Sequence, residues 1–365
     1  ELYTDVTKVK EKEFRATIEM RGKPLYPKMD VLFSMMREIL MESRLDDEKR
    51  LKEILAMLKS RLLASFLSSG HTTAALRALS YTSPMSKFKD DTDGIGFYEA
   101  VKKIEEDFDG QKETLIRNLK EIARRIFRAD NLMISYTSSE EGIEPMTKAF
   151  AAVKDSLYTG GEIPDEACIL HCRKRNEGFK TSSKVQYVAR VGNFIDGGQK
   201  YSGTLQILKV ILGYDYLWQN IRVKGGAYGC MSNFNRIGDA YLISYRDPNL
   251  ERTMEVYEGV VDYLKNFNVS DRDMNKFIIG TMSSLDRPMN PAAKGARSMN
   301  LYMNRVSEEM LRSERGQILD AQQEDIRALA DVVKAMLDQK LLCVIGSEEK
   351  IEEQRDMFLE VRTLS

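Results

Sequence analysis

The chain has 365 residues, of which 42% are hydrophobic and 30% are charged, and its formal net charge is −1. This balance is typical of a globular protein of about two domains. A net charge near zero gives no electrostatic reason to expect nucleic acid or an anionic membrane surface as a partner. No apolar run approaches the ~18 residues of a membrane-spanning helix. The four unevenly spaced cysteines favour reduced thiols, so we expect a cytoplasmic protein.

The pattern of the first elements in the chain recurs in its second half. Residues 18–40 are expected to form a short strand, a turn and an amphipathic helix, and residues 243–265 repeat this pattern at one constant spacing. Further on, residues 131–144 match residues 341–352 as a final strand followed by a helix. We therefore predict an α+β protein with two homologous domains, each an antiparallel-rich sheet with helices packed on one face.

The two predicted domains meet near the stretch 156–166, which resembles a linker. The first domain then covers residues 1–160 and the second covers residues 161–365. The second copy contains a strand at 185–191 and a long helix that have no counterpart in the first. We therefore expect the first copy to be incomplete at its N-terminus and the polypeptide to be a fragment that exposes apolar surface.

The long helix of the second copy is predicted over residues 203–222, where apolar side chains cover most of the circumference. Gly225 and Gly226 follow it directly, as glycines do near a helix C-cap. Arg222 then lies in the last helical turn. By itself this position has an ordinary explanation, because a cation there interacts favourably with the helix dipole and the terminal carbonyl groups.

A β-hairpin is predicted next, from the alternating segments 227–235 and 239–246. Tyr228 lies at the start of its first strand, where tyrosine is also an ordinary packing residue. Asp247 is expected to cap the following helix, with Pro248 at the first helical position.

The combination of these residues resembles a known family. The stretch LWQNIRVKGGAYG, followed by SYRDPN, is similar to the second half of the pitrilysin/insulinase family of zinc metallopeptidases, specifically the presequence-protease branch. The stretches 68–81, 185–192 and 283–296 agree with it, so the resemblance covers most of the chain. In that family two halves, each with two homologous α+β domains, close around a peptide, and the internal repeat fits one such half.

The resemblance implies specific roles for the glycine-centred stretch. Arg222 and Tyr228 would be the catalytic Arg–Tyr pair that the second half presents to the active site. The phenol of Tyr228 would stabilise the oxyanion, and Arg222 would anchor main-chain carbonyls of the substrate. Gly225, Gly226 and Ala227 would join this pair in binding the peptide, because glycine lets a backbone approach closely.

The zinc motif of the family, H-x-x-E-H, is absent from the sequence. The chain has two histidines, His71 and His171, which are a hundred residues apart. His71 is expected to cap a helix or make a surface contact. Cys168 and Cys172 flank His171, but no second ligand pair lies nearby in sequence, and Cys230 and Cys343 could join them only through folding. We therefore predict no metal site in this chain.

These observations predict the C-terminal half of a zinc endopeptidase that degrades short or unfolded peptides in a closed chamber. Zinc and its ligands would come from the missing N-terminal half of the same polypeptide, so this chain alone is expected to be inactive. The expected partners are peptide substrates and that N-terminal half. Two alternatives stay open, namely a non-catalytic structural core subunit of the same fold and a processing peptidase that makes one defined cut.

Overall fold

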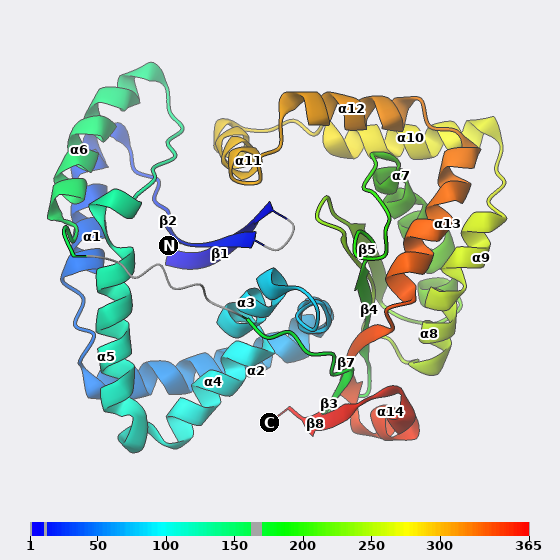
Figure 1. Cartoon of the computed structure of the whole chain (residues 1–365), viewed down its shortest axis with the longest axis horizontal. Helices are drawn as coiled ribbons and strands as arrows, with labels where there is room; N and C mark the ends of the chain where they lie inside the picture. Colours follow the sequence, from blue (N-terminus) through cyan, green and yellow to red (C-terminus); the bar gives the residue numbers. More distant parts are fainter. Residues whose placement is uncertain (1, 11–12, 162–169, 365) are drawn as a thin grey trace.

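A six-stranded mixed sheet organises the part of the chain that the computed structural model describes, which comprises residues 2–10, 13–161 and 170–364 (Figure 1). The spatial order of its strands is β5-β6-β4-β7-β3-β8. The strands are β3 Glu177–Thr181, β4 Tyr187–Asn193, β5 Gly229–Phe234, β6 Asp239–Tyr245, β7 Leu341–Ser347 and β8 Glu360–Thr363.

The sheet is antiparallel on one side and parallel on the other. The pairs β5–β6, β6–β4 and β4–β7 are antiparallel, whereas β7–β3 and β3–β8 are parallel. Every residue of β4 and of β7 is buried. Strands that are covered on both faces read as continuous apolar runs, which explains sequences such as LLCVI in β7.

Helices cover both faces of this sheet, because successive side chains of a strand point to opposite faces. Val188, Leu242 and Val344 belong to the core on one face. The helices that cover this face include α7 Thr204–Ile211, α8 Glu251–Glu258, α9 Val260–Lys265 and α13 Gln323–Leu337. On the other face, Tyr187 and Ile345 pack against the long helix α2, Glu48–Leu79. The expectation of helices on one face only is therefore wrong, since α2 from the first half of the chain supplies the second layer.

The remaining helices lie around this central unit. Figure 1 shows α1, α5 and α6 at one end of the molecule and the six-stranded sheet toward the other, with the short hairpin β1–β2 between them. These elements are β1 Leu2–Lys10, β2 Glu13–Met20, α1 Met29–Met41, α3 Pro84–Asp93, α4 Ile95–Glu106, α5 Phe108–Ile126, α6 Ile143–Ser156, α10 Asp271–Leu285, α11 Pro291–Met303, α12 Glu308–Leu319 and α14 Glu348–Glu353.

A second sheet like the one above does not form in the first half of the chain. Among the described residues there, the strands are those of the two-stranded hairpin β1–β2. The segment 131–137, which matches β7 in sequence, has no strand beside it and lies between short 3-10 turns at Ala129–Asn131 and Glu140–Gly142. A strand requires a ladder neighbour, so this prediction of a sheet in each copy is wrong. The division of the chain near residue 160 stays a prediction.

The predicted hairpin forms as β5 and β6, but the next helix begins later than expected. It starts at Glu251, so Asp247 does not cap it. The backbone of Asp247 instead exchanges two hydrogen bonds with Gln186, at N–O distances of 2.7 and 2.9 Å. Its carboxylate is buried and accepts hydrogen bonds from the Asn249 N–H and the Thr253 hydroxyl. This bridge keeps Asp247 extended, and the chain can coil only after it.

The helix predicted over 203–222 is present, with an irregular second half. After α7 the chain continues through two wider π-helical turns, Leu212–Tyr216 and Trp218–Val223. In these turns backbone N–H groups reach five residues back, as between Lys224 and Gln219 at 2.9 Å. Short π-helical segments are rare and occur frequently at functional sites. In the described part of the chain, no helix combines the length and apolarity needed to cross a membrane.

Candidate functional site

Arg222 and Tyr228 lie side by side on the surface, at the end of the sheet where β5 begins. The Arg222 guanidinium carbon is 4.1 Å from the centre of the Trp218 ring and 6.0 Å from the centre of the Tyr228 ring. Both side chains are exposed, Tyr228 to 67%. Stacking on Trp218 limits the conformations of Arg222, and therefore holds its charge in place before any ligand arrives.

The glycine pair has a local structural explanation. Gly226 has a φ of +79°, a conformation that favours glycine, and its N–H donates to the carbonyl of Arg222 at 2.9 Å. A side chain at Gly225 would place its Cβ 2.4 Å from the carbonyl oxygen of Ile221. Ala227 is buried in the core. The glycines are thus required to end the helix, and contact of 225–227 with a peptide stays a prediction.

Tyr228 is fixed by the main chain of the hairpin. Its N–H donates to the carbonyl groups of Tyr245 and Arg246, at 3.1 and 3.3 Å. Its ring meets the ring of Tyr245 edge to face, with 5.7 Å between the centres. The backbone of Tyr228 is therefore rigid, while its phenol is free to point outward.

A cluster of rings extends behind Tyr245 toward α2. The ring of His71 lies 4.8 Å from that of Tyr245, and the ring of Tyr187 lies 5.6 Å from it. The Tyr187 hydroxyl donates to the carbonyl of Leu67 at 2.6 Å. His71 lies within α2, just after a kink at Ser69, so the expectation that it caps a helix or lies on the surface is wrong. Its Nδ1 atom is buried without a hydrogen-bond partner, and burial lowers the pKa of the imidazole.

Arg246 completes the site and was not singled out by the sequence. Its guanidinium carbon is 5.4 Å from the centre of the Tyr245 ring, and the phenols of Tyr187 and Tyr245 beside it raise its pKa. The residue is exposed and has a φ of +48°. The stretch SYRDPN marked the region, but neither the backbone conformation nor the neighbouring rings can be read from those letters.

The residues of this site do not fit a zinc ion. Across the described ranges, no three His, Cys, Asp or Glu side chains come together as a metal-binding group. Cys172, Cys230 and Cys343 are free thiols, and burial raises the pKa of Cys230 to about 11. Cys168 lies outside the described residues.

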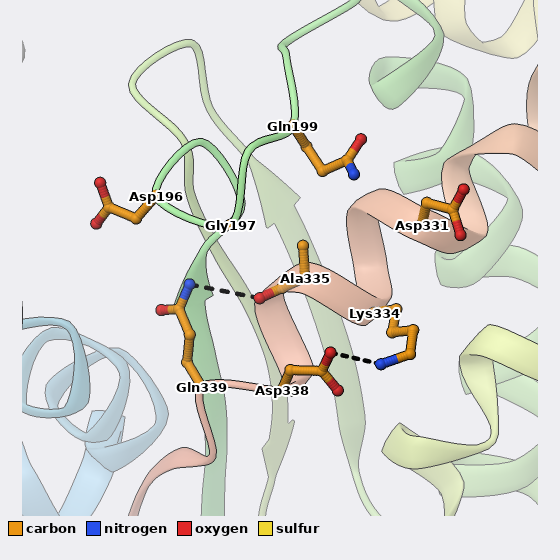
Figure 2. Close-up of a pocket in the computed structure, with 8 residues that line it drawn as sticks. All are labelled: Asp196, Gly197, Gln199, Asp331, Lys334, Ala335, Asp338 and Gln339. Carbon is orange, nitrogen blue, oxygen red and sulfur yellow. Dashed lines mark hydrogen bonds and ion pairs between the residues drawn. The ribbon is translucent and has the colours of Figure 1, made fainter.

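A separate hollow lies at the opposite end of the sheet. The pairing of Asn193 with Asp239 marks that end, whereas Gly229 pairs with Tyr245 at the end that carries Tyr228. The hollow is open, and it contains both acidic and basic side chains as well as glutamines (Figure 2). Its lining residues are Asp196, Gly197, Gln199, Asp331, Lys334, Ala335, Asp338 and Gln339. It contains none of the predicted site residues, so we place the candidate site at Arg222 and Tyr228.

Comparison with known proteins agrees with this fold and with the glycine-centred stretch. Two family models match the chain, "PreP C-terminal domain" over residues 176–348 and a peptidase-associated region of the same branch over residues 1–104. Protein HypA of Clostridium perfringens is 36% identical over 97% of this chain and 36% of its own length. Presequence protease 1, chloroplastic/mitochondrial, of Arabidopsis thaliana is 27% identical over 94% of this chain and 32% of its own length.

The crystal structure of a protease from Helicobacter pylori has a similar fold, with a TM-score of 0.57 and 15% identity over 91% of this chain and 78% of that one. The chain belongs to the presequence protease-like family of peptidases, as its C-terminal region. It spans about a third of the length of the curated relatives that it matches.

Proposed function

We propose that this chain is the substrate-positioning half of a zinc endopeptidase that degrades short or unfolded peptides in a closed chamber. Two observations support the proposal: membership of the presequence protease-like peptidase family, and the exposed position of Arg222 beside Tyr228. Zinc, its ligands and the general base would come from an N-terminal half of the same polypeptide. A cytoplasmic location stays a prediction.

The chemistry of the pair suits the hydrolysis of a peptide bond. Attack of water on a scissile carbonyl develops negative charge on the carbonyl oxygen, and a zinc ion supplied by the other half would polarise that oxygen. The phenol of Tyr228 donates a hydrogen bond to the same oxygen as its charge grows. Arg222 donates to carbonyl groups of the substrate main chain. A donor that acts mainly in the transition state raises kcat more than it lowers KM.

Substitution of Tyr228 in the longer polypeptide tests this proposal. We expect Tyr228→Phe to lower kcat about 100-fold on a quenched fluorescent peptide, because one oxyanion donor is worth on that order, while KM changes little. The matched control is Tyr214→Phe, which removes an equally exposed phenol from the outer side of the preceding helix. Equal kcat for the wild type and Tyr228→Phe would remove the oxyanion role.

The same preparation separates the alternatives. A structural core subunit would cleave no peptide with or without the substitution, and a processing peptidase would give one product pair where a degrading enzyme gives many, as mass spectrometry would show. The 365-residue chain alone should show no turnover in the presence of zinc. Turnover that copurifies with the chain through several independent steps would contradict this.

A further inference from the structure

Two arginines lie at the two ends of one exposed row of rings. Arg222 lies beside the Tyr228 ring at 6.0 Å, the Tyr228 and Tyr245 rings are 5.7 Å apart, and Arg246 lies beside the Tyr245 ring at 5.4 Å. Trp218 lies on the far side of Arg222. Among the described residues, neither arginine forms an ion pair with a carboxylate.

The surroundings of this row leave both charges without an internal counterion. The nearest acid in the sequence, Asp247, is buried and already accepts hydrogen bonds from Asn249 and Thr253. His71, on the inner side of Tyr245, adds no negative charge. Guanidinium groups on aromatic rings are weakly hydrated and present a planar set of donors, which suits a carboxylate better than a main-chain carbonyl.

Arg246 also holds a backbone conformation that arginine rarely adopts. Its φ of +48° lies in the left-handed region, which is unfavourable for a residue with a Cβ, and the neighbouring bridge between Asp247 and Gln186 keeps it there. Residues in such conformations cluster at ligand-binding sites. Glycine would satisfy this backbone more easily, so the presence of arginine calls for a function of the side chain.

We propose that Arg246 is a second substrate-binding residue, which together with Arg222 selects peptides that carry a carboxylate beside the residue bound at Tyr228. The proposal rests on the proposed function, because it assigns a substrate preference to the same site. The carboxylate could belong to an acidic side chain or to the C-terminus of a peptide, and both present the same chemistry to a guanidinium. The rings of Tyr228 and Tyr245 form the floor between the two charges.

The single tryptophan of the chain provides the measurement. Trp218 contacts Arg222, so its fluorescence should change when a peptide occupies the row. The probes are short tryptophan-free peptides of one sequence, with an internal Asp or Asn and with a free or amidated C-terminus. They are titrated into the wild-type chain, into Arg246→Gln, and into the control Arg252→Gln, which removes an exposed charge from the nearby α8.

We expect one of the two carboxylate arms, internal or terminal, to bind the wild type about threefold to fivefold more tightly than its amide counterpart, as for an exposed ion pair. The preference should vanish in Arg246→Gln, persist in Arg252→Gln, and disappear at about 1 M salt, where the screening length is only about 3 Å. Arg246→Gly, which accepts the left-handed backbone, should behave like Arg246→Gln and guards against misfolding of that variant.

Two other results would count against the proposal and differ from each other. Peptides that bind the wild type without a carboxylate preference, or an intact preference in Arg246→Gln, would overturn the role of Arg246 and leave the proposed function standing. A folded wild-type chain that binds none of the peptides up to their solubility limit would refute peptide binding at this row, and the proposed function of the pair would fall with it.

Discussion

His71 is held in a position where the neutral imidazole is favoured. Its Nδ1 atom is buried, its ring packs against Tyr245, and the positive charge of Arg246 lies on the same tyrosine ring. Protonation would place a second cation in this partly dry cluster, and burial accordingly lowers the pKa of His71 below its usual 6.5.

The stability of the chain should therefore depend on pH through His71. The unfolded state takes up a proton near pH 6.5, whereas the folded state resists it until a lower pH, so the unfolded state binds more protons in between. We expect the free energy of unfolding to be fully retained above pH 6.5 and to fall as the pH drops from there toward the lower pKa of the folded state. Urea unfolding of the wild type and His71→Gln from pH 7.5 to about 5 measures this.

The other histidine of the chain serves as the control. His171 is exposed, so His171→Gln should leave the pH dependence as it is in the wild type, while His71→Gln should flatten it. Identical profiles for all three proteins would show that His71 is not the group responsible.

Single residues differ in how far the sequence identifies them. Arg222 and Tyr228 could be found because the glycine-centred stretch is specific. His71 and Arg246 could not, because one depends on where α2 crosses the sheet and the other on a positive φ. Neither quantity leaves a local pattern in the sequence.

Among the elements, α2 shows how a single glycine permits a helix to lie against the sheet. The helix bends at Ser69, and a Cβ on the neighbouring Gly70 would lie 2.3 Å from the Tyr187 ring. Tyr187 in turn donates to the carbonyl of Leu67. The close approach of Gly70 therefore fixes the distance between α2 and β4, and with it the position of His71.

Two glycine substitutions test this contact. Gly70→Ala should destabilise the chain by about 1–3 kcal/mol, because the added methyl group overpacks a buried contact. Gly213 is also helical, but nothing lies within 4 Å of a Cβ there, so Gly213→Ala should stabilise the chain by about 0.5–1 kcal/mol. Opposite signs in urea unfolding confirm the contact, and a neutral Gly70→Ala would contradict it.

The regular elements of the second half of the chain could be predicted from periodicity, including the long helix and the hairpin β5–β6. The start of α8 could not, since the bridge between Gln186 and Asp247 joins residues far apart in sequence. Local capping rules favoured Asp247, and a tertiary hydrogen bond overrode them.

At the scale of the whole molecule, a buried cluster of charges joins the first half of the chain to the sheet. Arg77 of α2 donates to Glu177 of β3 at 2.6 and 3.0 Å and to Asp90 of α3 at 2.6 Å. The Tyr81 hydroxyl donates to Glu177 as well. Burial alone would raise the pKa of Glu177, but the bonds and charge of Arg77 outweigh it and lower that pKa.

Removal of Arg77 should be among the most damaging substitutions in the chain. Arg77→Met leaves two buried carboxylates with a much weaker set of cations, and loss of one partner from a buried ion pair typically costs about 3–5 kcal/mol. Arg312→Met breaks an exposed ion pair with Glu308 on α12 and should leave the unfolding midpoint unchanged. Similar midpoints for the two variants would show that the buried cluster contributes little.

The internal repeat led to a correct fold class and to a wrong expectation for the first copy. The helices recur where the repeat places them, because amphipathic patterns are local. The sheet does not recur, because strand pairing depends on neighbours that a matching stretch does not itself contain. The attachment of α2 to the sheet of the second copy likewise has no signature in either copy alone.

The widened turns before Arg222 have a consequence for how this surface arose and how easily it is lost. A π-helical turn holds one residue more than the α-helical turn it interrupts. Deleting one residue between Leu212 and Leu217 would restore a regular turn and rotate everything beyond it by about 100° around the helix axis. The guanidinium would then leave Tyr228 while every apolar contact of α7 stayed in register, so a single codon separates the paired arrangement from a well-folded chain that lacks it.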